Sequence, residues 1–299
     1  MTRFNGMERV LNYDAATAID TGKRDYQEDA VLCDFIQGAA TGFAVIADGM
    51  GGHAAGDVAS RIAADTALAA LQNMRRNMQR TSDIRPALQE IAETANQRIR
   101  DHSASQPETC GMGTTLLATV VRDGALHWIS VGDSPLFLFR KGSLRQLNQD
   151  HSLAPQIDLL VASGHMSAEE GKFHPDRNVL TSVLVGRSIA QIDAPQEPVA
   201  LQSGDVLIVS SDGLQSLDLS EIEVILRRLR SKSSAEIVTA LLKAVQRVDD
   251  PEQDNLSFSV IRVLSDTAVQ PVLAPLRLPV ASILPKLRTA VQTRFGFVR

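Results

Sequence analysis

Acidic residues at the borders of apolar runs are the part of this sequence best suited to chemistry. Three of them close such runs: Asp48 in "FAVIAD", Asp133 in "HWISVGD" and Asp212 in "VLIVSSD". Others open such runs: Asp254 in "DNLSFSV", and Glu28 with Asp29 in "EDAVLC". In an antiparallel sheet the end of one strand lies beside the start of its neighbour. The acids can therefore converge on one rim of a folded sheet.

A convergent set of carboxylates requires a cation, because like charges repel and burial strengthens the repulsion. All the candidate ligands are oxygen donors, and no histidine or cysteine cluster has the spacing of a transition-metal site. Hard Mg²⁺ or Mn²⁺ fits oxygen ligands better than zinc does. Two such ions about 3.5–4 Å apart, bridged by one carboxylate, could activate a water for in-line attack.

A simpler interpretation exists for each acid taken alone. An aspartate after a strand is usually a turn former or a helix cap, and a glycine-rich stretch such as "GMGG" can be only a flexible turn. Five separate instances, three of them beside glycine, favour the metal site. In that interpretation Gly49 lets a backbone carbonyl approach a cation, because no Cβ stands in the way.

Short strands must hold these acids in place. β-type runs occur at 41–47, 114–121, 125–131, 136–140, 205–211 and 256–263. The turns "RDG" and "GDSP" join the three runs between 114 and 140, and turns this tight predict antiparallel neighbours.

Helical periodicity appears in two pairs. The apolar stripes run over 58–71, 84–99, 222–229 and 237–248. The last two follow the capping-box patterns Ser220–Glu223 and Ser233–Glu236. Clustered strands with paired helices favour an α+β fold, in which antiparallel sheets pack on each other with helices outside.

One main domain is expected between two less regular ends. Residues 1–14 are interpreted as an N-terminal extension, and the polar stretch 150–179 as a short helix and loop typical of a functional lid. Prolines crowd the sequence after Val263, so the domain is expected to end near 264 and a flexible tail to occupy 265–299. That tail mixes basic and apolar residues, so a docking segment for a partner or an anionic membrane surface is the alternative to a disordered terminus.

Composition excludes several functions and locations. The chain has 299 residues and a formal charge of −5, so it lacks the overall excess of positive charge that is typical of nucleic-acid-binding proteins. No apolar stretch is long enough for a membrane span or a signal peptide. The two cysteines have no Cys-x-x-Cys spacing, which favours a reducing compartment. A cytoplasmic protein is therefore expected.

Eight ordered blocks resemble the metal-dependent Ser/Thr protein phosphatases of type 2C, in particular their bacterial branch. The blocks are "RDYQED", "ADGMGGHAAGDVAS", "GMGTTLLATVV", "VGDSP", "QDHS", "NVLTSVLVG", "SSDGL" and "DNLSFSVI". The resemblance covers about residues 15–264. It implies a four-layer α/β/β/α sandwich of two antiparallel sheets flanked by helix pairs, with a binuclear Mn²⁺ or Mg²⁺ site at one end and a mobile flap at about 153–179.

The resemblance also assigns roles to the acids. Asp48 matches the bridging ligand, and Gly49 contributes its carbonyl to the first metal. Asp212 and Asp254 match ligands of the second metal, Glu28 a ligand held mostly through water, and Asp133 a ligand of a third, weaker metal. Asp29 is expected to support these ligands without binding an ion itself.

Two further residues match catalytic positions of the family. Arg24 matches the arginine that grips the substrate phosphate, which suits a guanidinium because it can bind two phosphate oxygens at once; the alternative is an ordinary surface arginine. His53 matches the proposed general acid, which protonates the leaving oxygen; the alternative is a cap of the helix that follows. His151 is interpreted as structural. The chain departs from the family pattern at Pro135 and Ser182, where arginines are usual.

The function implied is hydrolysis of phosphoserine and phosphothreonine on proteins, reversing a bacterial Ser/Thr kinase. Metal-activated water would attack phosphorus without a covalent intermediate, and a cysteine nucleophile is not expected because no glycine- and arginine-rich loop surrounds either thiol. A monomer is expected, with no nucleic-acid partner and no transmembrane segment. The alternatives are a catalytically silent phosphoprotein-binding scaffold and a small-molecule phosphohydrolase.

Overall fold

Two antiparallel sheets form the centre of the protein. The computed structural model describes residues 11–36, 39, 41–51, 54–76 and 84–265. In spatial order, one sheet contains β1 (Leu11–Asp20), β11 (Leu256–Ser265), β10 (Val206–Ser210), β7 (Leu136–Arg140) and β8 (Ser143–Gln146). The other contains β2 (Asp29–Phe35), β3 (Thr41–Met50), β5 (Leu116–Arg122), β6 (Ala125–Val131) and β9 (Val199–Ala200), and β4 (Gly113–Thr114) pairs with β3.

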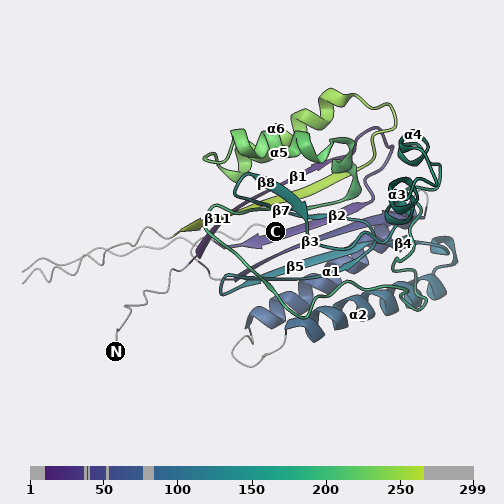
Figure 1. Ribbon diagram of the computed structural model, residues 1–299. Helices are drawn as coiled ribbons and strands as arrows, with labels where there is room; N and C mark the ends of the chain where they lie inside the picture. The colour runs from purple at the N-terminus through teal and green to yellow at the C-terminus, as the bar shows by residue number, and fades with distance from the viewer. Residues whose placement is uncertain (1–10, 37–38, 40, 52–53, 77–83, 266–299) are drawn as a thin grey trace, which may run out of the picture. The chain divides into compact units, whose positions relative to one another are not determined.

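Helix pairs cover the outer faces of both sheets, so the four-layer α/β/β/α prediction is confirmed (Figure 1). The helices α1 (Ala54–Arg76) and α2 (Ile84–Ser105) pack on the sheet that contains β3. The helices α5 (Leu219–Arg228) and α6 (Ser234–Val248) pack on the sheet that contains β10. A third apolar core, with Ile46, Trp128 and Leu138 among its members, lies between the sheets.

Turn chemistry explains the local connections. The "RDG" turn between β5 and β6 places Asp123 at φ 50° and Gly124 at φ 75°, the positive angles that the tightest hairpin turns need. The "GDSP" turn behaves differently from the prediction, because β6 and β7 belong to different sheets. Gly132, at φ 107°, lies in that turn, where the chain passes from one sheet to the other. Asp133 is thereby placed at the edge where both sheets end.

The ends of two elements also differ from the expected ones. The strand β1 begins at Leu11, so residues 11–14, expected in the extension, pair with β11. The capping box of α5 is formed by Asp218 and Glu221 instead of Ser220 and Glu223, because the helix begins one residue before Ser220. The box of Ser233 and Glu236 before α6 is confirmed.

The remaining helices are short. The predicted flap contains α3 (Ala154–Ala162) and α4 (Ala168–Lys172), and single 3₁₀ turns occur at η1 (Pro107–Thr109) and η2 (Asp212–Ser216). Arg177 ties the two flap helices together, because it donates to both carboxylate oxygens of Asp158 in α3, at 2.7 and 3.1 Å, and to the Gly171 carbonyl of α4 at 3.3 Å.

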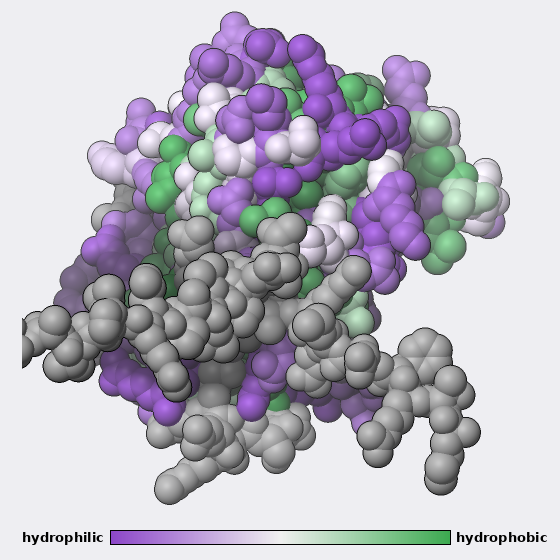
Figure 2. All heavy atoms as spheres, turned by 90° about the vertical axis from the view of Figure 1, so that its left-hand side faces the viewer, coloured by the Kyte–Doolittle hydropathy of each residue, from purple (hydrophilic) through white to green (hydrophobic). Residues whose placement is uncertain are grey.

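The surface and the chain ends add two observations. Where the described residues are visible at the end of the sandwich seen in Figure 2, hydrophilic side chains alternate with small hydrophobic groups. In the described ranges, no helix combines the length and the apolar character needed to cross a bilayer. Residues 266–299, which include almost all of the predicted tail, lie outside the described residues.

Candidate metal centre and phosphate site

Strand pairing places two of the acids beside each other on adjacent strands. Asp29 at the start of β2 is the register partner of Asp48 in β3. The strand does not stop at Asp48, as the apolar run suggested, but continues to Met50, because Gly49 and Met50 pair with Thr114 and Gly113 of β4. Asp48 is further fixed by its backbone N–H, which donates to the Thr115 hydroxyl at 2.9 Å.

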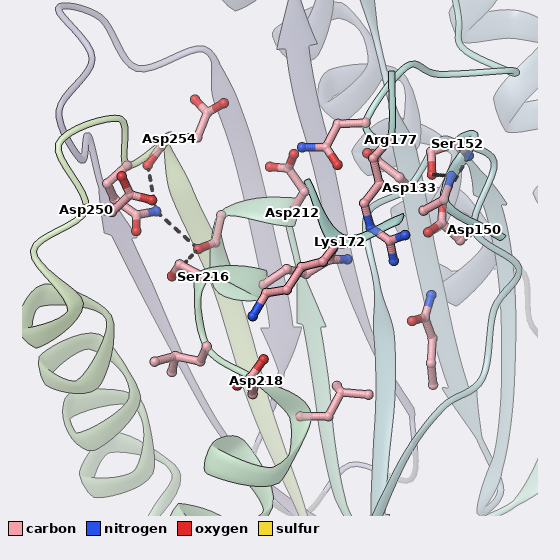
Figure 3. A pocket seen from close by; sticks show the side chains of 18 of the residues that line it. Asp133, Asp150, Ser152, Lys172, Arg177, Asp212, Ser216, Asp218, Asp250 and Asp254 are labelled. Atoms are coloured by element: carbon pink, nitrogen blue, oxygen red, sulfur yellow. Dashed lines mark hydrogen bonds between the residues drawn. The ribbon is translucent and has the colours of Figure 1, made fainter. Parts of the chain in front are cut away.

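The other acids reach the same rim from neighbouring elements. Asp212 opens η2 two residues after the last residue of β10, and Asp254 lies two residues before β11, the neighbour of β10. Asp133 reaches the rim from the turn between the sheets. Figure 3 shows these three side chains around one cavity. Glu28 is held beside them, because its N–H donates to the Asn255 side chain at 2.7 Å.

Burial and mutual repulsion disfavour charge on these carboxylates. Burial, opposed by hydrogen bonds from Ser211, raises the pKa of Asp29 to about 7. Burial and the nearby Asp212 raise the pKa of Asp133 to about 8, and burial with the nearby Asp254 raises that of Asp212 to about 6. Burial also raises the pKa of Asp48 well above its ordinary value, and four neighbouring aspartates add to that effect. A cation among them would favour their charged forms.

The residues present fit a divalent ion. Among the described residues, Glu28 Oε1, Asp29 Oδ1 and Asp212 Oδ1 are buried oxygens without a hydrogen-bond partner. Orphaned buried acceptors are costly unless something else satisfies them, and oxygen-only donors suit Mg²⁺ or Mn²⁺. No three Asp, Glu, His or Cys side chains of the described ranges already surround one point closely enough to hold an ion.

Glycine at position 49 is required by its surroundings. A Cβ at Gly49 would lie 2.2 Å from the Gly56 carbonyl oxygen and 2.5 Å from that of Glu28. The Gly49 N–H also donates to the Glu28 carbonyl at 3.2 Å. The start of α1 can approach β3 this closely only because side chains are absent.

A cation from the protein itself stands at the rim. Arg24 donates from Nη2 to Asp254 Oδ2 at 2.6 Å, and its side chain is 56% exposed. It lines the same cavity as Asp133 and Asp212, so its guanidinium can meet a phosphate that enters there. His53, the other predicted catalytic residue, lies outside the described residues.

His151 is structural, as predicted. Only 1% of its surface is exposed. Its ring Nδ1 accepts from the backbone N–H of Gly132 at 3.2 Å, and the backbone N–H of His151 donates to the Gly132 carbonyl at 3.1 Å. At one of the two departures from the family pattern, the Ser182 hydroxyl donates to the Gln191 carbonyl and accepts from the Gln191 N–H, which closes a local loop.

Sequence reasoning missed the neutral residues that orient the acids. The Ser211 hydroxyl donates to Asp29 Oδ2 at 2.8 Å and accepts from the Ser257 N–H at 3.0 Å. The Thr115 hydroxyl bonds to that of Ser134 at 2.8 Å, besides accepting from Asp48. Ser211 and Ser134 stand next to the predicted acids Asp212 and Asp133 in the sequence, but serine is too common beside strands for that signal to stand out.

The similarity to known proteins agrees with this geometry. Residues 21–257 match the family profile described as Protein phosphatase 2C. The chain belongs to the protein phosphatase 2C family. It is 35% identical over 190 residues to the serine/threonine phosphatase stp of Listeria monocytogenes serotype 4b (strain F2365), an alignment that covers 63% of this chain and 73% of the relative.

Solved structures of protein phosphatases share its fold. The Mycobacterium tuberculosis serine/threonine phosphatase PstP/Ppp superposes with a TM-score of 0.71 at 28% identity, covering 85% of this chain and 99% of that one. The PstP catalytic domain in complex with two manganese ions superposes with a TM-score of 0.68 at 27% identity, over the same shares of both chains. As a protein phosphatase 2C, this protein is a metal-dependent protein serine/threonine phosphatase.

Proposed function

We propose that the core site binds two divalent ions, Mn²⁺ or Mg²⁺, through Asp48, the Gly49 carbonyl, Asp212 and Asp254. The observation that carries this proposal is the set of buried, mutually repelling carboxylates with orphaned oxygens at one rim of the sandwich. Glu28 would contribute through a water, Asp133 would hold a third, weaker ion, and Asp29 would keep its neighbours oriented. The ions, when bound, supply a nucleophilic water and neutralise phosphate charge.

The chain's own residues bind and orient the phosphate. Arg24 would turn from Asp254 to two phosphate oxygens, since an exposed guanidinium can exchange one oxyanion for another at little cost. His53, directly before α1, would deliver a proton to the departing serine or threonine oxygen, which is a poor leaving group when unprotonated.

The proposed substrates are phosphorylated proteins, and the opposing enzyme would be a bacterial Ser/Thr kinase. The excess of carboxylates around the cavity disfavours a nucleic-acid partner. Both cysteines carry free thiols, which suits a reducing cytoplasm. We further propose that the protein acts as a monomer and that the catalytic domain ends near residue 264, where β11 ends.

Hydrolysis of a small aryl phosphate tests the metal-dependent mechanism. We expect turnover with Mn²⁺ that a chelator abolishes and that Asp48→Ala or Asp212→Asn lowers at least about a hundredfold, because even residues that only orient metal ligands cost roughly 10–100-fold. Asp65→Asn, at an exposed position of α1, removes the same charge far from the site and is the control. Full turnover in excess chelator would contradict the mechanism.

Metal binding separates this function from the scaffold alternative. Calorimetric titration of Mn²⁺ into metal-stripped protein should show binding that Asp48→Ala removes. Failure to bind Mn²⁺ below millimolar concentration would favour a silent phosphoprotein-binding module.

A further inference from the structure

The cavity beside the acids is larger than a phosphorylated side chain requires. Its volume is about 1380 Å³, whereas pockets for small molecules are roughly 300–1,000 Å³. The proposed metal ligands form only one part of its lining. The flap, the segment from η2 into α5, the loop before β11 and residues of β7 and β8 form most of the rest (Figure 3). The additional space suits the polypeptide on either side of a phosphorylated residue.

Four apolar residues, here called the apolar floor, belong to the lining of this additional space. Phe137, Leu217 and Ile222 line it and are almost completely buried, while Leu219 beside them is 49% exposed. An apolar floor can accept the backbone and the aliphatic parts of a substrate segment. It does not by itself select one substrate from another.

Three carboxylates, here called the acidic wall, border that floor: Asp218, Asp250 and Glu252. Asp218 and Glu252 are exposed, and Asp250 is half-buried. Among the described residues none of the three forms an ion pair. Asp250 Oδ1 accepts from the Glu252 N–H at 2.9 Å, which fixes the loop that carries both. In the part of the chain that the structure describes, their negative charge therefore borders the cavity without an ion-pair partner.

Most cations that line the cavity already have partners. Arg177 is held by both oxygens of Asp158, Lys23 by Asp249 at 3.2 Å, and Arg24 by Asp254. Lys172 projects into the same opening in Figure 3, and its ammonium lies 5.8 Å from the centre of the Phe173 ring. Among the described residues here, three carboxylates and one lysine have no ion-pair partner, so this part of the cavity is acidic.

We propose that the acidic wall binds arginine or lysine side chains that flank the phosphorylated residue, so that the preferred substrates are phosphoproteins with basic residues within a few positions of the phosphate. The inference rests on the proposed function, since it concerns the same cavity. It follows from charge complementarity and from the continuity of the wall with the phosphate site. A segment with acidic flanks would meet repulsion at the same place.

Matched phosphopeptides test this inference. Three phosphothreonine peptides of equal length, flanked by arginines, glutamines or glutamates, are compared by kcat/KM with Mn²⁺ present. We expect the arginine peptide to exceed the glutamine peptide about three- to tenfold, as a few exposed charge pairs allow, and the glutamate peptide to rank last.

The variant Asp218→Asn/Asp250→Asn/Glu252→Gln should remove most of this preference and leave hydrolysis of the aryl phosphate unchanged. The control Asp65→Asn/Glu93→Gln/Asp101→Asn changes net charge equally on α1 and α2 and should keep the preference. Absence of aryl phosphate hydrolysis in the unmodified protein would overturn the proposed function itself. Three results would overturn only the substrate inference, provided that aryl phosphate hydrolysis is normal. The three peptides could be used equally, the glutamate peptide could be preferred, or the first variant could keep the preference for arginine.

Discussion

Ser211 illustrates how a neutral residue prepares a charged site. Its hydroxyl donates to one oxygen of Asp29 and leaves the other, Oδ1, as a buried acceptor without a partner in the described structure. Asp29 faces Asp48 across the β2–β3 pair. The hydroxyl therefore sets the orientation of a carboxylate that is the register partner of the proposed bridging ligand.

Removing that hydroxyl should weaken metal binding more than folding. We expect Ser211→Ala to lower Mn²⁺ affinity roughly 10–100-fold, because Asp29 would lose the donor that orients it. Calorimetric titration measures the change. Ser182→Ala also removes a buried hydroxyl that forms two hydrogen bonds, and it should lower stability but keep Mn²⁺ affinity. If both variants bind Mn²⁺ equally well, Ser211 has no orienting role.

His151 links residue chemistry to the behaviour of the protein with pH. Its Nδ1 must be unprotonated to accept from the Gly132 N–H. Burial lowers the pKa of His151, although Asp193 and Asp150 nearby oppose that effect. A group with a lowered folded-state pKa gives stability that is present above its unfolded value of about 6.5 and is lost as pH falls through the folded value.

Substitution of His151 should therefore change the acid side of the stability curve. We expect His151→Gln to be less stable than the unmodified protein at pH 7.5, and the gap in melting temperature to narrow as pH falls below about 6.5, because only the unmodified protein must protonate a buried imidazole. Thermal unfolding of both proteins across pH 5–8 provides the measurement. A gap that stays constant over that range would contradict the argument.

At the scale of elements, the approach of α1 to β3 depends on glycine. The backbone of Gly56 in α1 lies against Gly49 in β3, and the carbonyl of Glu28, the residue directly before β2, borders the same space. Three elements therefore meet at the proposed ligand carbonyl without side chains between them. The β3–β4 pairing holds the strand straight through this point.

A methyl group at that junction should displace backbone. We expect Gly49→Ala to cost about 1–3 kcal/mol of unfolding free energy, the usual range for overpacking, and to lower Mn²⁺ affinity. Gly113→Ala in β4 is the control, because the new Cβ would meet chiefly the Val185 side chain, which can move. Urea unfolding measures both variants. Equal costs at the two positions would show that backbone contact at Gly49 is not limiting.

At the scale of the whole molecule, the sandwich holds its acids together against their repulsion. The three apolar cores fix the two sheets and both helix layers, and the rim where the acids meet is the part that this packing leaves charged. Binding of divalent cations should then stabilise the folded state as well as enable chemistry.

Added Mn²⁺ should raise the melting temperature. A ligand at a hundredfold excess over its Kd adds about 2.7 kcal/mol to the folded state, which corresponds to roughly 5–10 °C for a domain of this size. The shift should vanish in Asp48→Ala and persist in Asp65→Asn. Scanning calorimetry with and without Mn²⁺ gives the answer, and an equal shift in both variants would place the stabilising ion elsewhere.

The sequence alone determined the layers and the identity of the acids. Alternating and 3.6-residue patterns are local properties, so the strands, the helix pairs and the capping box of Ser233 followed from them. For the same reason, the sequence was enough to recognise that Asp48, Asp133, Asp212 and Asp254 lie at the borders of apolar runs.

Only the tertiary structure decided how distant segments meet. The passage of "GDSP" between sheets, the pairing that carries β3 through Asp48, and the hydroxyl of Ser211 on Asp29 all join residues whose partners lie on other elements. The acidic wall is a further case, because it assembles from loops before α5 and β11. Such contacts depend on three-dimensional packing, which no local pattern records.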